Sequence, residues 1–116
     1  METPSQSSLH RIFIGESYRT DGKPLYEWLV RHAKSRGIAG ATVVRGMMGF
    51  GANAKIIRTF KIERLSEGLP IIVEIVETED KIEDLLSFAE SNFNGGILAT
   101  VENIQGRICR GGSTVS

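Results

Sequence analysis

The stretch LPIIVEIVE, residues 69–77, carries the strongest β-strand signal in the chain. Its apolar side chains alternate between two faces, with Ile71, Val73 and Ile75 on one and Ile72 and Val76 on the other. A strand that is apolar on both faces is typical of the middle of a covered sheet. The stretch therefore predicts a central strand that needs apolar partners on both faces.

Six further segments flank this strand. The apolar run IFI within residues 9–15 predicts a second central strand, and a turn follows at Asp21-Gly22. The other expected elements are a helix over 23–36, a strand over 39–46, a partly exposed strand or ribbon arm over 56–65, a helix after Thr78 and a last strand or hairpin over 97–108. The first helix has Pro24 at its first turn and Gly37 at its end, and Thr78 can cap the second. The apolar stripes of the two helices are Leu25, Leu29 and Ala33, and Ile82, Leu85, Leu86, Ala89 and Phe93.

The order strand, helix, strand, arm, strand, helix, strand matches the βαββαβ plan of the ferredoxin-like sandwich. We therefore predict an α+β fold with a four-stranded antiparallel sheet and two helices on one face. The runs IFI and IIVEIV would form the central strands, yet two helices cover only one face of the sheet. Because full burial of an apolar side chain contributes about 1.5 to 3 kcal/mol, we expect self-association to cover the other face.

Length and composition fit one small domain. The chain has 116 residues, of which 41% are hydrophobic, so a core can form without disulfide or metal cross-links. We expect the domain over residues 9–109, between flexible tails over 1–8 and 110–116. The formal net charge is zero, which argues against the whole-molecule field of a general nucleic-acid or membrane binder. No nucleic-acid partner is expected.

A cytoplasmic location is expected from two features. Cys109 is the single cysteine, so neither an intramolecular disulfide nor a cysteine-based zinc cluster can form within the chain. The polar beginning METPSQSS lacks the basic start and apolar core of a secretory signal.

No group of residues predicts catalysis. His10 and His32 are expected on a strand and a helix, and neither stands at a spacing that implies a relay with an acid or a nucleophile. Each is more plausibly a surface histidine or a hydrogen-bonded core histidine. Cys109 has basic neighbours in Arg107 and Arg110, but a lone thiol more often acts as a small hydrophobic side chain. We expect a protein that is not an enzyme and that has no metal site.

The segment RGMMGFGANAK, residues 45–55, is the most informative one for binding. Its three glycines allow several amide N–H groups to point at one anion, and Arg45 and Lys55 add positive charge. Its spacing is neither a Walker A motif nor GxGxxG, so a plain turn remains an alternative. Residues 34–64 hold seven lysines and arginines against one acid, which fits either a local anion site or a solvated basic face.

A second glycine-rich segment, Asn94-Gly95-Gly96, lies before the last expected strand. In a ferredoxin-like trimer this loop can meet the loop after the second strand, from the same subunit or from a neighbour. Two converging glycine-rich loops would form a better pocket than either loop alone.

Several motifs together resemble a family of uncharacterised small proteins within the PII-like superfamily. They are GKPLY, GATV-x-RG, GFG and LP-x-x-x-EIV, in this order, and the likeness extends from about Leu9 to Ile104. The resemblance implies a ferredoxin-like subunit that assembles as a trimer, with ligands in the clefts between subunits. PII proteins bind adenine nucleotides there and use a mobile loop to contact a transporter, channel or enzyme.

The loop base of PII proteins carries Gly-Phe-Gly followed by Arg and Gln. Gly49, Phe50 and Gly51 match its first part, whereas Ala52 and Asn53 replace the polar pair. The resemblance therefore implies backbone contacts to a phosphate rather than these side-chain contacts. The expected ligand-binding residues are Arg45, Gly46, Gly49, Phe50, Gly51, Ala52, Asn53, Lys55, Asn94, Gly95 and Gly96.

The sequence thus favours a PII-like regulatory protein that takes ATP, ADP, AMP or a similar small anion as its ligand and requires no cofactor. Ligand binding would order the loop and change the surface that a partner protein meets. The alternative is a trimeric structural or metal-tolerance protein of the same fold, whose loops only close the trimer. That protein would show no response to nucleotides.

Overall fold

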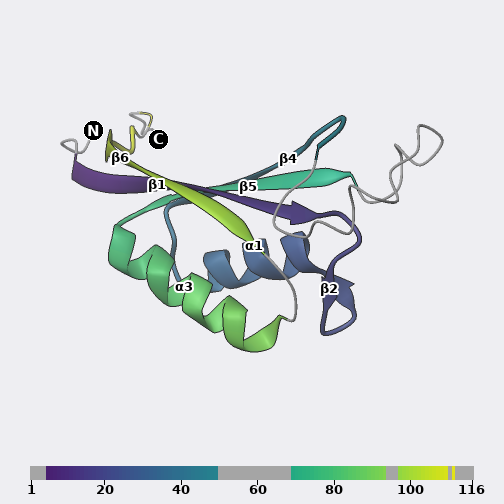
Figure 1. Cartoon of the computed structure of the whole chain (residues 1–116). Helices are drawn as coiled ribbons and strands as arrows, with labels where there is room; N and C mark the ends of the chain where they lie inside the picture. The colour runs from purple at the N-terminus through teal and green to yellow at the C-terminus, as the bar shows by residue number, and fades with distance from the viewer. Residues whose placement is uncertain (1–4, 50–68, 94–96, 110, 112–116) are drawn as a thin grey trace.

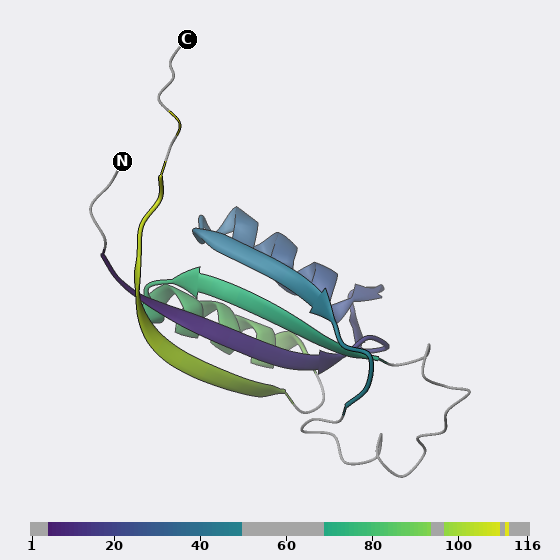
Figure 2. The same cartoon turned by 90° about the horizontal axis from the view of Figure 1, so that it is seen from above.

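The computed structural model describes residues 5–49, 69–93, 97–109 and 111 of the chain (Figure 1). The elements are β1 (Ser5–Gly15), β2 (Arg19–Thr20), β3 (Lys23–Pro24), α1 (Leu25–Ser35), β4 (Gly40–Arg45), β5 (Pro70–Glu77), α3 (Glu79–Asn92) and β6 (Leu98–Gly106). Four strands form one antiparallel sheet in the order β4-β5-β1-β6, and β2 and β3 form a separate short hairpin. The predicted α+β sandwich is confirmed, with both helices on one face of the sheet (Figures 1 and 2).

The two most apolar strands lie side by side in the centre of the sheet, as predicted. In the β1–β5 register Ile12 pairs with Val73 and Phe13 with Ile72. Directly opposite residues share a face of the sheet, so the alternation of β5 continues across β1. One face carries the buried side chains and the other carries side chains that are only partly covered.

The core lies between the buried face of the central strands and the two helices. The predicted apolar stripes are confirmed, because the buried residues are Ile12, Ile14, Ile71, Val73 and Ile75 from the sheet and Leu25, Trp28, Leu29, Ala33, Ile82, Leu85 and Ala89 from the helices. Leu86 and Phe93 pack against this core from its margin. Each large side chain that is fully buried contributes about 1.5 to 3 kcal/mol.

Two predicted turns owe their shape to left-handed backbone angles. Asp21 and Gly22, which join β2 to β3, have φ angles of 53° and 75°. This pair of positive angles suits a two-residue hairpin turn. Gly37, with φ of 74°, ends α1 and lets the Ile38 N–H donate to the Ala33 carbonyl at 3.1 Å.

Two predictions are wrong at the ends of elements. The expected flexible tail over 1–8 extends too far, because β1 begins at Ser5 and Ser8 is buried. Ser5 to Ser8 pair with Asn103 to Gly106 of β6, and this backbone pairing does not need an apolar pattern. Thr78 occupies the position before α3, but its side chain makes no capping hydrogen bond. The expected arm over 56–65 and most of the tail over 110–116 lie outside the described residues.

Among the described residues, no helix is long and apolar enough to cross a membrane.

Candidate functional site

Three of the expected ligand-binding residues are described, and all three lie at or just beyond the end of β4. Arg45 is the last residue of the strand, and Gly46 and Gly49 follow it. We call this the loop end of the sheet; it also holds the end of β1 and the starts of β5 and β6. The expected residues Phe50, Gly51, Ala52, Asn53, Lys55, Asn94, Gly95 and Gly96 lie outside the described residues.

The residues that flank the second glycine-rich segment also lead to the loop end. Phe93, just before it, packs against Tyr18 with ring centroids 5.3 Å apart, and Leu98, just after it, pairs with Phe13. Leu98 and Arg45 lie on opposite edges of the sheet, which are about 14 Å apart for four strands. The two segments therefore start from the same end of the subunit but from different edges.

Hydrogen bonds hold the backbone on both sides of the first glycine-rich segment. The Gly46 N–H donates to the Pro70 carbonyl at 2.7 Å, and the Glu16 N–H donates to the Leu69 carbonyl at 2.9 Å. The Arg45 guanidinium is paired, since its Nη2 lies 2.5 Å from Oε2 of Glu16. An anion that binds Arg45 must therefore share it with a carboxylate.

Gly46 has a packing role that is independent of any ligand. A Cβ atom at this position would lie 2.8 Å from Cγ of Pro70, which is closer than real Cβ contacts. One glycine of the motif is therefore required by the close approach of the chain to Pro70. The predicted role of its amide in anion binding is not the simplest reason for this glycine, because that amide already donates to Pro70.

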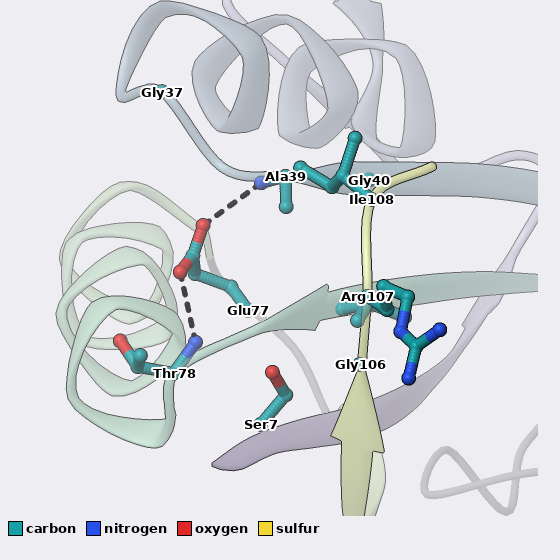
Figure 3. A pocket seen from close by; sticks show the side chains of 10 residues that line it. Ser7, Gly37, Ala39, Gly40, Glu77, Thr78, Gly106, Arg107 and Ile108 are labelled. Atoms are coloured by element: carbon teal, nitrogen blue, oxygen red, sulfur yellow. Dashed lines mark hydrogen bonds between the residues drawn. The ribbon is translucent and has the colours of Figure 1, made fainter. Parts of the chain in front are cut away.

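A cavity of about 500 Å³ lies at the opposite end of the sheet (Figure 3). We call this the pocket end. The lining residues are Ser7, Gly37, Ala39, Gly40, Val76, Glu77, Thr78, Gly106, Arg107 and Ile108. They come from the start of β1, the connection into β4, the end of β5 and the end of β6, and the volume is in the range of small-molecule sites.

None of these lining residues was predicted from the sequence as part of a site. They are spread over four segments, and none of the segments forms a recognisable motif. Three glycines at or near the ends of elements, Gly37, Gly40 and Gly106, were the only available signal.

Glu77 builds one wall of the cavity. Its carboxylate accepts hydrogen bonds from the Ala39 N–H at 2.8 Å and the Thr78 N–H at 3.0 Å, and its side chain is 13% exposed. Lys81 Nζ lies 4.0 Å from Glu77 Oε2, which partly balances the charge. Glu77 thus ties the connection that precedes β4 to Thr78, the residue before α3.

The cavity combines opposite charges with small polar groups. Glu77 and Arg107 come from different segments, and the Arg107 guanidinium points away from Glu77 (Figure 3). Ser7 and Thr78 add hydroxyl groups to the lining. None of its described lining residues is a histidine or a cysteine. In the described part of the chain, no three His, Cys, Asp or Glu side chains are grouped as metal ligands. The arrangement suits binding of a small polar molecule that carries both an anionic group and hydrogen-bond donors.

The two histidines lie away from the cavity. His10 is fully buried in β1, and neither ring nitrogen has a partner among the described residues. The surface alternative is therefore wrong for His10, and a hydrogen-bonded core histidine stays a prediction. His32 lies in α1 against the ring of Trp28, with centroids 4.2 Å apart. Cys109 is an exposed free thiol.

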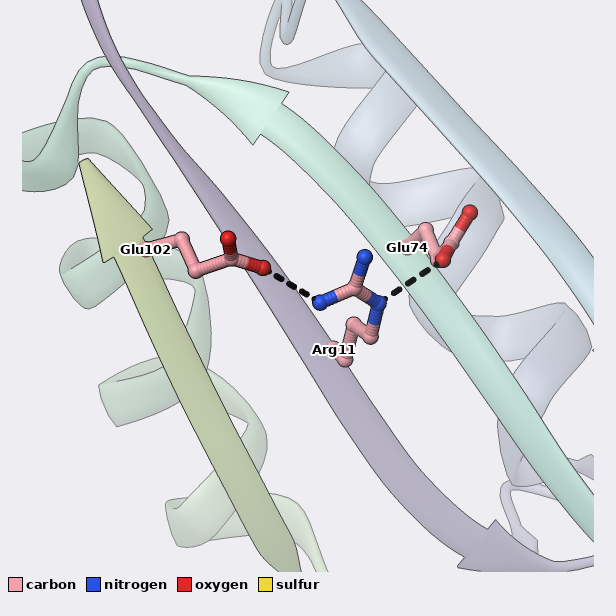
Figure 4. Close-up of polar contacts among 3 residues, drawn as sticks. All are labelled: Arg11, Glu74 and Glu102. Carbon is pink, nitrogen blue, oxygen red and sulfur yellow. Dashed lines mark hydrogen bonds and ion pairs between the residues drawn. The ribbon is translucent and has the colours of Figure 1, made fainter. Parts of the chain in front are cut away.

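The sheet face that the helices leave uncovered has a charged centre (Figure 4). Arg11 Nε lies 3.0 Å from Glu74 Oε2, and Arg11 Nη1 lies 2.5 Å from Glu102 Oε1. The hydrogen bonds that Arg11 donates to Glu102 and then to Glu74 raise its pKa, so this residue stays charged. Beside this cluster, an apolar row crosses all four strands through Val44, Ile72, Phe13 and Leu98.

This arrangement of sheet and helices is the fold of PII-like signalling proteins. A solved PII-like signalling protein of Thermus thermophilus superposes with a TM-score of 0.62 at 20% identity, covering 90% of this chain and 93% of that one. A nitrogen regulatory PII-like protein of Thiomonas intermedia was solved with ADP, AMP and bicarbonate. It superposes with a TM-score of 0.60 at 15% identity, covering 91% of this chain and 100% of that one. At these identities the likeness establishes the fold.

The chain belongs to the family DUF190, described as "Uncharacterized ACR", whose model matches residues 7–106. A UPF0166 protein of Aquifex aeolicus is 40% identical over 100 residues, which are 86% of this chain and 92% of that protein. A UPF0166 protein of Methanocaldococcus jannaschii is 33% identical over 81 residues, which are 70% of this chain and 73% of that protein. The resemblance to an uncharacterised PII-like family is confirmed.

Proposed function

We propose that this protein is a cytoplasmic PII-like regulatory protein that binds an adenine nucleotide, ATP, ADP or AMP, or a similar small anion between the subunits of a homotrimer. The observation that carries the proposal is the placement of two complementary regions. The glycine-rich segment with Arg45 leaves from the loop end of the sheet, and the cavity with Arg107 lies at the pocket end.

These two ends are too far apart to form one site within a subunit. The eight residues of β5 run from the loop end to the pocket end, a distance of about 25 Å at the usual rise of a strand. Side chains at the two ends cannot contact the same phosphate group. One ligand can meet both regions only where the loop end of one subunit faces the pocket end of another.

A contact between different surfaces of two identical subunits is a heterologous contact, which closes into a ring when the rotation allows it. A trimeric ring would contain three such clefts. The uncovered sheet face supports the assembly, because its apolar row of Val44, Ile72, Phe13 and Leu98 spans the sheet and two of these side chains are more than 40% exposed. Burying this face against other subunits would contribute apolar area.

Chemistry of the cavity favours a nucleotide over a simple ion. A volume of about 500 Å³ exceeds that of a single small anion, and the lining includes one acidic residue, Glu77, and one basic residue, Arg107. A nucleotide presents hydrogen-bond donors on its base and ribose and negative charge on its phosphates. The solved PII-like protein of Thiomonas intermedia that has ADP and AMP bound gives a precedent for such ligands on this fold.

We infer a regulatory role rather than a catalytic one. Binding at the cleft would favour one arrangement of the glycine-rich segment, because a ligand shifts a conformational equilibrium by its differential affinity. That shift would change the surface offered to a transporter, channel or enzyme.

Calorimetry of the purified protein with ATP, ADP, AMP and bicarbonate tests the proposal, together with light scattering for the oligomeric state. We expect a trimer that binds at least one nucleotide, with affinity about tenfold lower in Arg45→Ala and in Arg107→Ala. Arg31→Ala, which removes an arginine from an exposed pair on α1, is the control and should bind normally. A trimer that binds none of the nucleotides would favour the structural alternative, and a monomer would contradict both the proposal and that alternative.

A further inference from the structure

Glu16 contacts both ends of the segment that carries the glycine-rich motif. Its backbone N–H donates to the carbonyl of Leu69, where the chain enters β5, at 2.9 Å. Its carboxylate pairs with Arg45, where the chain leaves β4, at 2.5 Å. One residue at the end of β1 thus holds both strand ends that border the motif.

The ion pair lies across an intervening strand. β4 and β1 are not neighbours in the sheet, since β5 runs between them. Arg45 is opposite Ile71 of β5, so its side chain starts from the same face of the sheet as the buried Ile71. To reach Glu16 the guanidinium must extend over the start of β5, away from the edge of β4.

The two partners differ in exposure. The side chain of Arg45 is 55% exposed, whereas that of Glu16 is 23% exposed. An incoming anion can therefore reach the guanidinium, but it meets the Glu16 carboxylate at the same place. A phosphate that binds Arg45 must displace the Glu16 carboxylate or share the guanidinium with it. The negative charge of the carboxylate repels the phosphate.

We propose that Glu16 is a positioning residue of the proposed anion site. In the free protein Glu16 holds the Arg45 guanidinium, and it competes with the ligand phosphate for this guanidinium. This inference rests on the proposed function and describes how ligand binding at that site is regulated. The ligand must be a phosphate-bearing anion that can compete with a carboxylate for a guanidinium. Glu16 keeps the site closed to weakly competing anions and links occupation of the site to release of the β4 end from β1.

A purely structural role for Glu16 makes the opposite prediction. If the pair only kept Arg45 in the geometry that the ligand needs, loss of the carboxylate would weaken ligand binding. If the carboxylate competes with the ligand, its loss strengthens binding. The sign of the change in affinity therefore separates the two roles.

Glu16→Gln is the decisive variant, because it removes the charge while it keeps the side-chain size and the backbone N–H that binds Leu69. We expect it to bind the nucleotide about threefold to tenfold more tightly than the wild type, as measured by calorimetry at low salt. The gain should be smaller in the double variant Glu16→Gln/Arg45→Ala, because no guanidinium remains to be released. Glu16→Asp keeps a carboxylate and should bind more like the wild type.

Glu27→Gln is the matched control. It makes the same change in net charge and breaks a comparable exposed pair, Glu27–Arg31 at 3.0 Å on α1. It should leave nucleotide affinity unchanged. A thermal melt of each variant shows that its fold is retained.

The outcomes distinguish this proposal from the proposed function. Wild-type binding with equal or weaker binding by a folded Glu16→Gln variant overturns the role of Glu16 and leaves the nucleotide site intact. Absence of binding of ATP, ADP and AMP in every variant overturns both. An equal gain in Glu16→Gln and Glu27→Gln reflects net charge alone and also overturns the role of Glu16.

Discussion

The loop end and the pocket end of the sheet are built in different ways. At the loop end, backbone hydrogen bonds to Leu69 and Pro70 and the Arg45–Glu16 pair tie the chain down, and Gly46 is in close contact with Pro70. At the pocket end, the ends of strands diverge around a cavity, and the Glu77 carboxylate holds its wall. The loop end therefore carries the glycine-rich motif, whereas the pocket end carries the cavity.

This contrast shows why neither end is a complete site. The motif supplies amides and positive charge close to one another in the sequence, but the Arg45 guanidinium and the Gly46 amide are engaged in contacts within the subunit. The cavity supplies volume and a polar lining, but it lies at the other end of β5. In the trimer that we propose, the two ends of different subunits would come together and form one complete site.

The largest expected effect comes from the two glycines at opposite ends of β4. Gly46→Ala places a Cβ atom 2.8 Å from Cγ of Pro70, whereas a Cβ atom at Gly40 meets nothing within 4 Å. We expect Gly46→Ala to lower the free energy of unfolding by about 1 to 3 kcal/mol and Gly40→Ala to change it by less than about 0.5 kcal/mol. Urea denaturation measures both. Equal effects would show that the two ends are not packed differently.

A somewhat smaller effect is expected at the wall of the cavity. Glu77→Ala leaves the N–H groups of Ala39 and Thr78 without their acceptor, which costs about 1 to 2 kcal/mol after water has replaced part of the bonding. Glu77→Gln keeps one acceptor oxygen and should cost about half as much. Hydrogen exchange at the Ala39 amide should become faster in both variants. Unchanged exchange at Ala39 would mean that Glu77 does not hold this wall.

The core between the two ends contains one costly group. His10 is fully buried, and its ring nitrogens have no partner among the described residues. His10→Leu removes these polar atoms at similar volume, so we expect the free energy of unfolding to rise by about 1 kcal/mol. Urea denaturation at neutral pH provides the measurement. A loss of stability would contradict the expectation that the buried ring nitrogens are a net cost.

The smallest effect on the stability of the subunit is expected on the uncovered sheet face. Arg11→Met removes the partner of Glu74 and Glu102, but these groups are exposed or half-exposed, so water screens their pairs and the loss of stability should be small. Two carboxylates would then face each other on the surface that we propose is buried in the trimer. Light scattering over a dilution series should show weaker assembly at low salt. Assembly as strong as that of the wild type would place the contact elsewhere.

Most of the fold could be predicted because its signals are local. The alternation in LPIIVEIVE and the apolar stripe of each helix arise from residues within a single segment. The structure buries one face of that strand and the apolar stripes of both helices. The start of β1 was missed because Ser5 to Ser8 have no apolar pattern and are held by pairing with β6, which lies far away in the sequence.

The candidate site could be predicted only in part. Arg45 and Gly46 were found by their local composition, but their contacts with Glu16 and Pro70 depend on strand order, which composition does not contain. The cavity was missed for the same reason, since Ser7, Gly40 and Arg107 become neighbours only through the sheet. The roles of Phe50 to Lys55 and of Asn94 to Gly96 stay predictions.

A subunit-mixing experiment tests the central claim, that one site joins the loop end of one subunit to the pocket end of another. Arg45→Ala removes the arginine of the loop end, and Arg107→Ala removes that of the pocket end. Each variant alone should therefore bind nucleotide weakly. Co-expression of the two variants gives mixed rings in which one cleft combines an intact loop end with an intact pocket end. The account predicts about one site of wild-type affinity per mixed trimer, measured by calorimetry. Mixed trimers that bind no better than the two separate variants would contradict a site shared between subunits.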